Sequence, residues 1–346
     1  MPSEAPRLVG IDIARGFAIL GMFVAHAIPR TDDSELLVDG RSSILFATLA
    51  GVSLGIVTGS EHPLERGRRG DRVVSLVMRA MILFVLGVIL SRLGSEVAVI
   101  LDYYAIMFLL MTPVLFLPRW ALGALAGVLV AVAPTVAMAV GDASQAAPPP
   151  IYLLHEYLLS GSYPVLIWLP FLLAGLIAAR SGLGSARTQF WMVAAGTFSA
   201  VLGYGAARVL PGVTAAEHSG TTAEVLGSGG FAIAIIGVLL WIVSPERGRA
   251  GRTVRVTLFP VSAIGSMALT VYTLQVITLA VFAVLRDDSG GAIEYPGWPL
   301  LIGMTLASLV LASLWRAFVG KGPLERLLAV VTRPPRSRPP ARIDRE

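Results

Sequence analysis

The chain has 346 residues, of which 55% are hydrophobic and only 14% charged, and its mean hydropathy is +0.76. A soluble protein of this length needs more charge to cover its surface, so the composition excludes a soluble enzyme and indicates an integral membrane protein. The absence of cysteine excludes disulfide bonds, thiolate metal sites and a cysteine nucleophile. The net charge of +5 comes from arginines in short loops and the tail, which favours a role in topology over nucleic-acid binding.

Several apolar runs reach the roughly 20 residues that a helix needs to cross a bilayer. They predict an all-α, polytopic membrane protein built as a bundle of about ten transmembrane helices. In chain order the predicted helices are 9–29, 42–60, 73–92, 97–117, 120–140, 162–180, 189–209, 229–244, 258–285 and 297–318. Residues 1–331 are interpreted as a single transmembrane domain, and the Pro- and Arg-rich segment 332–346 as a disordered basic cytoplasmic tail. The first run is long enough to span and lacks a small-residue cleavage site, so no cleavable signal peptide is expected.

Arginine is concentrated in alternate loops. The arginine-rich segments are 61–72, 180–187, 246–255 and the tail, whereas the loops 30–39, 141–161 and 211–228 are acidic or neutral. Cytoplasmic loops of membrane proteins carry an excess of Lys and Arg. This pattern therefore predicts a multi-pass protein of the cell membrane with both termini in the cytoplasm.

Arg15 and His26 lie eleven residues apart within the first apolar run. Eleven residues are about three helical turns, so the two side chains share one helix face and are separated by roughly 16 Å. An ionisable residue in a transmembrane helix costs about 2.5 kcal/mol or more at the bilayer centre and usually faces a bundle interior or a water-filled cavity. Both residues also have a structural alternative. His26 is suited to a helix end at the membrane interface, and Arg15 can pair with Asp12 or extend to the lipid headgroups.

Under this topology, further polar and aromatic residues fall near the outer ends of helices. Together with His26 they are Asp39, Arg41, Arg92, Asp102, Tyr103, Tyr163, Trp168 and Gln275. Because they are predicted to lie at a similar depth in the membrane, we expect them to line one outward-facing cavity. The alternatives are an ion pair between Asp102 and Arg92, an interfacial aromatic belt for the two tyrosines and the tryptophan, and an interhelical hydrogen bond for Gln275.

A histidine near a carboxylate in such a cavity is suited to general-base catalysis, because its unperturbed pKa is about 6.5. His26 is the candidate base, with Asp102 or Asp39 orienting its ring. Arginine pairs bidentately with phosphate, so an acyl-CoA bound from the cytoplasm is expected to meet Arg15 and Arg79 and to deliver its thioester toward His26.

Arg41 is a further candidate for cofactor binding, and Arg119 is an alternative to Arg79. The candidate substrate-binding residues are Arg92, Tyr103, Tyr163, Trp168 and Gln275. The four histidines show no ligand spacing, so no metal is expected. Motifs of nucleotide hydrolysis, zinc proteolysis and serine-hydrolase chemistry do not occur in a suitable context.

The opening Arg7-Leu-Val-Gly-Ile-Asp-Ile-Ala-Arg-Gly-Phe-Ala-Ile-Leu-Gly-Met-Phe-Val-Ala-His26 resembles that of transmembrane acyltransferases similar to heparan-α-glucosaminide N-acetyltransferase, and of the related YeiB-like bacterial proteins. Segments 39–51, 163–175 and 265–275 are similar as well, so the resemblance spans most of the chain. The spacing Arg-x10-His also resembles the first-helix motif of the acyltransferase-3 family, whose histidine is taken as catalytic. The resemblance implies a transmembrane acyltransferase with acetyl-CoA or another acyl-CoA as co-substrate.

One position departs from this pattern. The heparan-modifying enzyme has an asparagine at the position of His26 and its catalytic histidine in the following lumenal loop, whereas residues 29–38 here contain no histidine. A catalytic role for His26 is therefore implied only by the resemblance to the acyltransferase-3 motif. Heparan is not implied as the substrate.

The leading hypothesis is an acyl-CoA-dependent transfer to a hydroxyl or amine of a glycan or lipid-linked sugar at the outer face, with His26 as the base. The alternative is a small-solute transporter or permease, which a bundle with buried charges also suits. A non-catalytic membrane partner protein is the third possibility. The expected partners are the lipid bilayer, the acyl-CoA and the acceptor, with a homo-oligomer left open.

Overall fold

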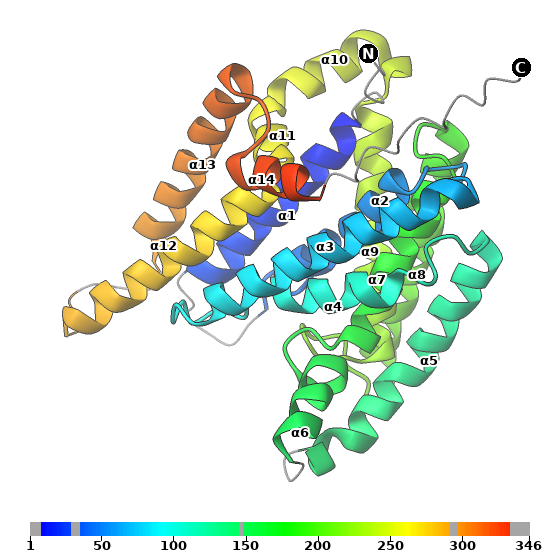
Figure 1. Ribbon diagram of the computed structural model, residues 1–346, viewed down its shortest axis with the longest axis horizontal. Coiled ribbons are helices and arrows are strands. Elements are labelled where there is room, and N and C mark those ends of the chain that lie inside the picture. Colours follow the sequence, from blue (N-terminus) through cyan, green and yellow to red (C-terminus); the bar gives the residue numbers. More distant parts are fainter. Residues whose placement is uncertain (1–7, 29–34, 145–147, 291, 293–296, 333–346) are drawn as a thin grey trace, which may run out of the picture.

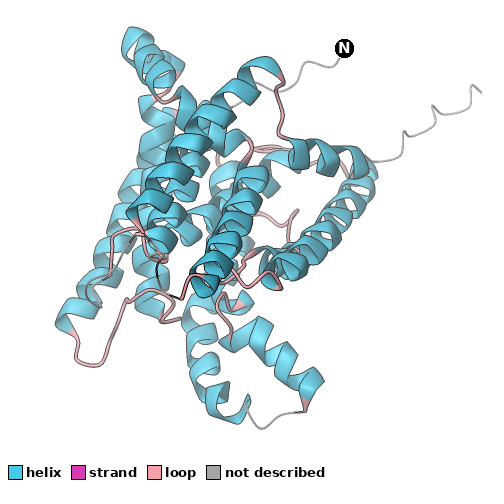
Figure 2. Ribbon diagram, turned by 90° about the vertical axis from the view of Figure 1, so that its left-hand side faces the viewer, coloured by secondary structure: helices cyan, strands magenta, loops and turns pink. Residues whose placement is uncertain are grey.

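The computed structural model describes residues 8–28, 35–144, 148–290, 292 and 297–332. These residues form helices joined by loops, and no strand occurs among them (Figure 2). The all-α architecture predicted from the sequence is therefore confirmed. The predicted tail lies, from residue 333 onward, outside the described residues.

Sixteen helical elements are described, including one π-helix and one 3₁₀-helix (Figure 1). They are α1 (Val9–Ala27), α2 (Arg41–Val57), α3 (Arg66–Ser91), α4 (Leu101–Met111), α5 (Arg119–Ser144), α6 (Pro149–His155), η1 (Glu156–Ser160), α7 (Val165–Arg180), α8 (Ala186–Val209), α9 (Thr222–Ile242), η2 (Pro245–Arg247), α10 (Gly248–Thr257), α11 (Phe259–Ser266), α12 (Ala268–Asp288), α13 (Trp298–Phe318) and α14 (Pro323–Val331).

Within the described residues, seven helices are long and apolar enough to cross a membrane: α1, α3, α5, α8, α9, α12 and α13. The count is eight if the segments Pro149–Ser160 and Val165–Arg180, which are bent by 43° relative to each other, form one broken span. All ten predicted runs fall on helices, but a count of ten also needs the shorter α2 and α4. The predicted run 258–285 is divided, since α11 ends and α12 begins around Met267.

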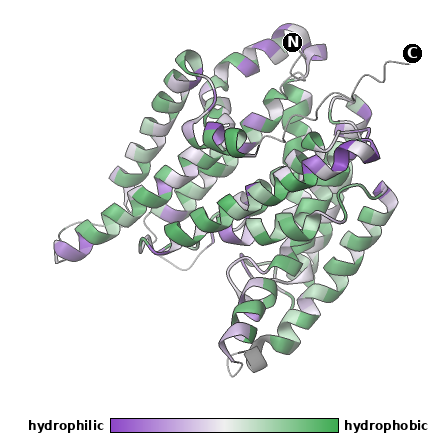
Figure 3. Ribbon diagram, viewed as in Figure 1, coloured by the Kyte–Doolittle hydropathy of each residue, from purple (hydrophilic) through white to green (hydrophobic). Residues whose placement is uncertain are grey.

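Burial separates the helices that face lipid from those that form the centre. α1 is the most buried of the spanning helices, with 61% of its apolar window inside the protein, whereas the value for α5 is 11%. Apolar side chains that are exposed in a membrane protein face hydrocarbon, and such residues are frequent along α5, whose ribbon is mainly hydrophobic in Figure 3. Hydrophilic residues gather toward helix ends, as at the start of α3 and along α10 (Figure 3).

Glycines let the central helices approach closely. A Cβ atom at Gly265 of α11 would lie 1.8 Å from the carbonyl oxygen of Asp12 in α1, and one at Gly51 of α2 would lie 2.0 Å from that of Leu172 in α7. Such contacts are available only to glycine, and close approach through small residues is the usual way helices pack in lipid. Both glycines belong to segments that carry the family resemblance, so these segments fix the crossing of α1 with α11 and that of α2 with α7.

α1 and α2 run antiparallel, because Arg15 of α1 donates to Ser53 near the end of α2 while Gly21 packs against Ser42 at its start. The bundle therefore has two distinct ends. We call them the Arg15 end and the His26 end, after the α1 residues that mark them. The helices alternate in direction, as predicted. The arginine distribution predicts that the Arg15 end faces the cytoplasm.

Candidate functional site

A cavity of about 360 Å³ lies at the His26 end, where α1 ends and α2, α7 and α9 begin. It is lined by Ala25, His26, Asp39, Gly40, Ser42, Ser43, Glu96, Val97, Ala98, Tyr163, Glu217 and His218. Of the eleven predicted site residues, His26, Asp39 and Tyr163 lie in this wall. The cavity thus combines two histidines, three carboxylates and three hydroxyl groups, which come from segments far apart in the sequence.

His26 occupies the last turn of α1, and its Nδ1 atom lies 3.0 Å from Nε2 of Gln275 in α12. An amide nitrogen can only donate, so Nδ1 of the imidazole is the acceptor. A neutral imidazole that accepts at Nδ1 carries its proton on Nε2. Neutral His26 is therefore held as a hydrogen-bond donor through Nε2.

His218 lies in the loop between α8 and α9 and has the opposite arrangement. Its Nδ1 atom is 3.0 Å from the carbonyl oxygen of Ser162, which can only accept. The proton of neutral His218 is thus on Nδ1, which leaves the lone pair on Nε2. The ring stacks on Trp168, with centroids 6.1 Å apart, and meets Tyr163 edge-on at 5.3 Å. Packing and the hydrogen bond together fix the orientation of this imidazole.

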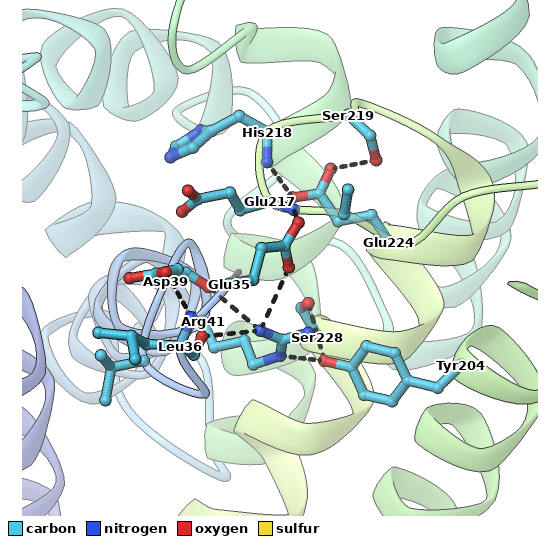
Figure 4. Close-up of polar contacts among 12 residues, drawn as sticks. Glu35, Leu36, Asp39, Arg41, Tyr204, Glu217, His218, Ser219, Glu224 and Ser228 are labelled. Atoms are coloured by element: carbon cyan, nitrogen blue, oxygen red, sulfur yellow. Dashed lines mark hydrogen bonds and ion pairs between the residues drawn. The ribbon is translucent and has the colours of Figure 1, made fainter. Parts of the chain in front are cut away.

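A capping box at the start of α9 holds the loop that carries His218 (Figure 4). Thr221 accepts the backbone N–H of Glu224 through its Oγ1 atom at 3.0 Å. The carboxylate of Glu224 is almost fully buried and accepts the backbone N–H groups of His218 at 2.8 Å and Gly220 at 2.7 Å. It also accepts the hydroxyl of Ser219 at 3.2 Å. One buried carboxylate therefore organises the whole turn that presents His218.

The carboxylates of the cavity are held by further local contacts. Asp39 is 1% exposed and accepts the backbone N–H of Leu36 at 2.7 Å, which closes the turn before α2. Glu96 forms a bidentate ion pair with Arg286 in the last turn of α12, at 2.7 and 2.9 Å. This pair joins the rim of the cavity to the helix that supplies Gln275.

Arg41, predicted to bind the cofactor, is engaged in contacts at the same end (Figure 4). Its Nε atom donates to the hydroxyl of Tyr204 at 2.8 Å, its guanidinium lies 5.1 Å from the centre of that ring, and its Nη1 atom is 3.9 Å from Glu35. Twelve residues of α2, about 18 Å, separate it from Ser53 at the Arg15 end. The structure therefore does not bring Arg41 together with Arg15.

Asp102 and Tyr103 lie behind the cavity wall. Asp102 accepts the hydroxyl of Tyr157 from η1 at 2.9 Å, and Tyr103 packs between Tyr157 and Tyr163 with ring centroids 4.8 and 5.6 Å apart. Asp102 therefore pairs with a tyrosine, and Gln275 is hydrogen-bonded to His26. Arg92 is exposed at the end of α3, away from these contacts.

At the Arg15 end, Arg15 itself is bonded to Asp12 at 3.1 Å and to the hydroxyl of Ser53 at 2.8 Å. Arg316 of α13 reaches the same aspartate at 3.8 Å. Arg79 of α3 is close enough to experience the charges of Arg15 and Glu325.

The Nε atom of Arg79 is buried without a hydrogen-bond partner among the residues that the structure describes. That Arg15 and Arg79 together bind a cofactor stays a prediction. On the face of α1 between Arg15 and His26, the side chains of Ile19 and Met22 are buried.

Residues 7–206 match the family described as heparan-alpha-glucosaminide N-acetyltransferase, catalytic. The chain belongs to this family. Residues 175–334 also match a protein family of unknown function, DUF418. Among curated proteins, no sequence matches the chain. The family assignment, together with the spanning helices, makes this protein a relative of transmembrane N-acetyltransferases.

The cavity draws on both matched regions of this N-acetyltransferase relative. His26, Asp39 and Tyr163 lie within residues 7–206, whereas His218 and Gln275 lie only in the DUF418 region. Sequence reasoning assigned no role to His218. Two signals pointed to it: its loop was predicted to lie on the same side as His26, and the Thr221-x-x-Glu224 pattern of a capping box follows directly. In the described part of the chain, no group of three or more His, Asp or Glu is placed to hold a metal ion.

Proposed function

We propose that the cavity at the His26 end transfers an acyl group, acetyl being the simplest, from acyl-CoA to a hydroxyl or amine of a glycan or lipid-linked sugar at the outer face. The observation that carries the proposal is the pair of histidines with opposite partners at Nδ1, the amide nitrogen of Gln275 at His26 and the carbonyl oxygen of Ser162 at His218. His218 offers an unprotonated Nε2 atom and His26 a protonated one in the wall of a single cavity.

This pair suits the proton transfers of the reaction and the charge of its intermediate. Nε2 of His218 takes the proton of the attacking hydroxyl or amine as that group bonds to the thioester carbonyl carbon. When the carbon–sulfur bond breaks, the His218 imidazolium returns this proton to the departing thiolate, while the Nε2–H of neutral His26 donates a hydrogen bond to the oxygen that carries the negative charge of the tetrahedral intermediate. In the sequence-based hypothesis His26 is the base; the hydrogen bond from Gln275 favours His26 as the donor instead, and the exchange of roles is part of the proposal.

The acyl donor is proposed to bind from the Arg15 end, with Arg15 and Arg79 meeting its phosphates. The unpartnered Nε of Arg79 supports this, because a buried guanidinium N–H without an acceptor is suited to pair with a phosphate oxygen. The distance of roughly 16 Å along α1 suits the pantetheine arm. Ile19 and Met22 occupy this face, so donor binding requires them to move aside.

The test is acyl transfer by the purified protein in lipid nanodiscs, with acetyl-CoA as donor and glucosamine as probe acceptor. Because the chain contains no cysteine, a thiol reagent reports only the coenzyme A that is released. We expect acceptor-dependent thiol release and an acetylated product, and His26→Gln should lower the rate. Transport of an intact solute into vesicles without thiol release, with a panel of hydroxyl and amine acceptors tested, would instead support the permease alternative.

A further inference from the structure

A second concavity, an apolar groove of about 650 Å³, is lined mainly by residues of α12 and α13. Its floor includes Phe23 of α1 and Gln275 of α12, both almost fully buried. Its walls include Leu274 and Leu311, which are more than half exposed. The groove therefore opens from the lipid-facing surface down to the central helix of the bundle.

Among the described residues that line this groove, none carries a charge. Gln275 is therefore unusual as a buried amide in an apolar lining. Its side chain is 2% exposed, and its Oε1 atom is buried without a hydrogen-bond partner among the described residues. An unsatisfied buried acceptor is costly unless something donates to it. The Nε2 atom of the same amide lies 3.0 Å from His26. One amide thus separates the groove from the polar cavity.

The dimensions of the groove suit an extended chain. Its lining follows α12 from Met267 to Thr278, a rise of about 16 Å for eleven residues. Met267 lies toward the Arg15 end, whereas Gln275, about two turns further along α12, lies beside His26. An occupant with one polar end is therefore oriented, with that end at Gln275 and its apolar part toward the Arg15 end.

We propose that this groove binds the hydrocarbon chain of a lipid acceptor, whose head group donates a hydroxyl or amide hydrogen to Oε1 of Gln275. The proposal rests on the proposed function, because it identifies the acceptor as a lipid held beside His26. Charge and polarity favour this occupant. A helix from a second copy would cover the apolar walls but leave Oε1 of Gln275 unsatisfied, and a plain annular acyl chain would do the same.

The experiment uses the full chain in nanodiscs and a long-chain fatty alcohol with a diazirine in its alkyl chain. We expect photolabelling of α12 and α13 residues that line the groove, including Leu274 and Leu311. Ala307→Trp should abolish this labelling, because Ala307 is an exposed lining residue and an indole there fills the groove. Ala124→Trp, at an exposed position of α5, is the matched control and should leave labelling unchanged.

Gln275→Leu supplies the second measurement. It should weaken labelling by the alcohol roughly threefold to tenfold, the effect of losing one hydrogen bond, and leave labelling by the corresponding alkane probe unchanged.

Equal labelling along α5 and in the groove would show annular lipid only and overturn the proposal, as would crosslinks between two copies through α12 and α13. If Ala307→Trp abolishes labelling while acetyl transfer to the lipid alcohol continues at the parent rate, the groove does not serve the acceptor and the inference fails alone. If labelling behaves as expected but no variant or parent releases thiol, the proposed function fails while lipid binding stands.

Discussion

The two ends of α1 use buried polar residues in opposite ways. At the Arg15 end, arginine side chains join helices through neighbouring oxygens: Arg180 donates to the hydroxyl of Thr58 at 2.7 Å and to the carbonyl oxygens of Ser60 at 2.5 Å and Leu115 at 2.9 Å. At the His26 end, His26 is hydrogen-bonded to Gln275 and His218 to the carbonyl oxygen of Ser162, and both imidazoles line a cavity. Buried polar groups therefore form a scaffold at one end and an accessible set of proton donors and acceptors at the other.

This difference explains why a polar residue inside a membrane bundle is not by itself a functional residue. Arg15 shares two oxygen acceptors, from Asp12 and Ser53, and these contacts join α1 to α2. In the described part of the chain, the Nε atoms of Arg79 and Arg180 are both buried and unpartnered, but the other two nitrogens of Arg180 are bonded to α2, its following turn and the segment after α4. The comparison thus separates Arg15 and Arg180, whose hydrogen bonds join helices, from Arg79, whose Nε atom is buried without a partner among the described residues.

The largest effect is expected from His218→Gln, which tests whether the His26 end carries the proton-transfer chemistry. If His218 is the base, this variant should lower acetyl transfer by about 10² to 10⁴, the usual cost of removing a general base. Glutamine retains a hydrogen bond to the carbonyl of Ser162 but cannot take the proton. The measurement is thiol release at saturating acetyl-CoA, with His62→Gln, a change at an exposed loop histidine, as the control. A His218→Gln protein that is folded, binds acetyl-CoA and works at the parent rate would contradict the role of His218.

At the opposite end, Arg180→Ala should lower stability and not chemistry. The substitution leaves a hydroxyl and carbonyl groups of α2 and the α4 end without their donor, and each buried group left unsatisfied costs about 1–3 kcal/mol. Arg187→Ala, at an exposed arginine in the first turn of α8, should have little effect. Unfolding of both variants in detergent, followed by tryptophan fluorescence, gives the comparison. An unchanged midpoint for Arg180→Ala would show that this end is not a scaffold.

The sequence predicted the helices better than the contacts between them. Apolar runs, loop arginines and the spacing of Arg15 and His26 depend on local pattern, and the helix ends meet where that pattern placed them. The bond between His26 and Gln275 joins positions 249 residues apart, and no local signal gives its direction. Asp102 and Arg92 lie at matching depth, yet depth along a helix does not determine rotation about its axis, and Asp102 turns toward Tyr157.

Arg79→Ala tests whether the Arg15 end binds the acyl donor. If this arginine meets the phosphates of coenzyme A, its loss should raise the dissociation constant for acetyl-CoA about tenfold, or about 1.4 kcal/mol, with a smaller effect on the rate at saturation. Arg68→Ala removes a charge from an exposed position on the same helix and is the matched control. Equilibrium binding in nanodiscs measures both. Equal changes in the two variants would indicate only the general attraction of a basic surface.

The smallest expected effect tests how His218 is held. Thr221→Ala removes the oxygen that accepts the N–H of Glu224 and should destabilise the start of α9 by about 1 kcal/mol. Because the same capping box fixes the backbone of His218, acetyl transfer should fall more than binding of acetyl-CoA does. Thr221→Ser keeps the cap and should restore the rate, whereas Thr253→Ala, on exposed α10, should change neither quantity. If Thr221→Ala lowers stability but leaves the rate intact, the loop does not need its cap to present His218, and the stacking on Trp168 must suffice to orient the ring.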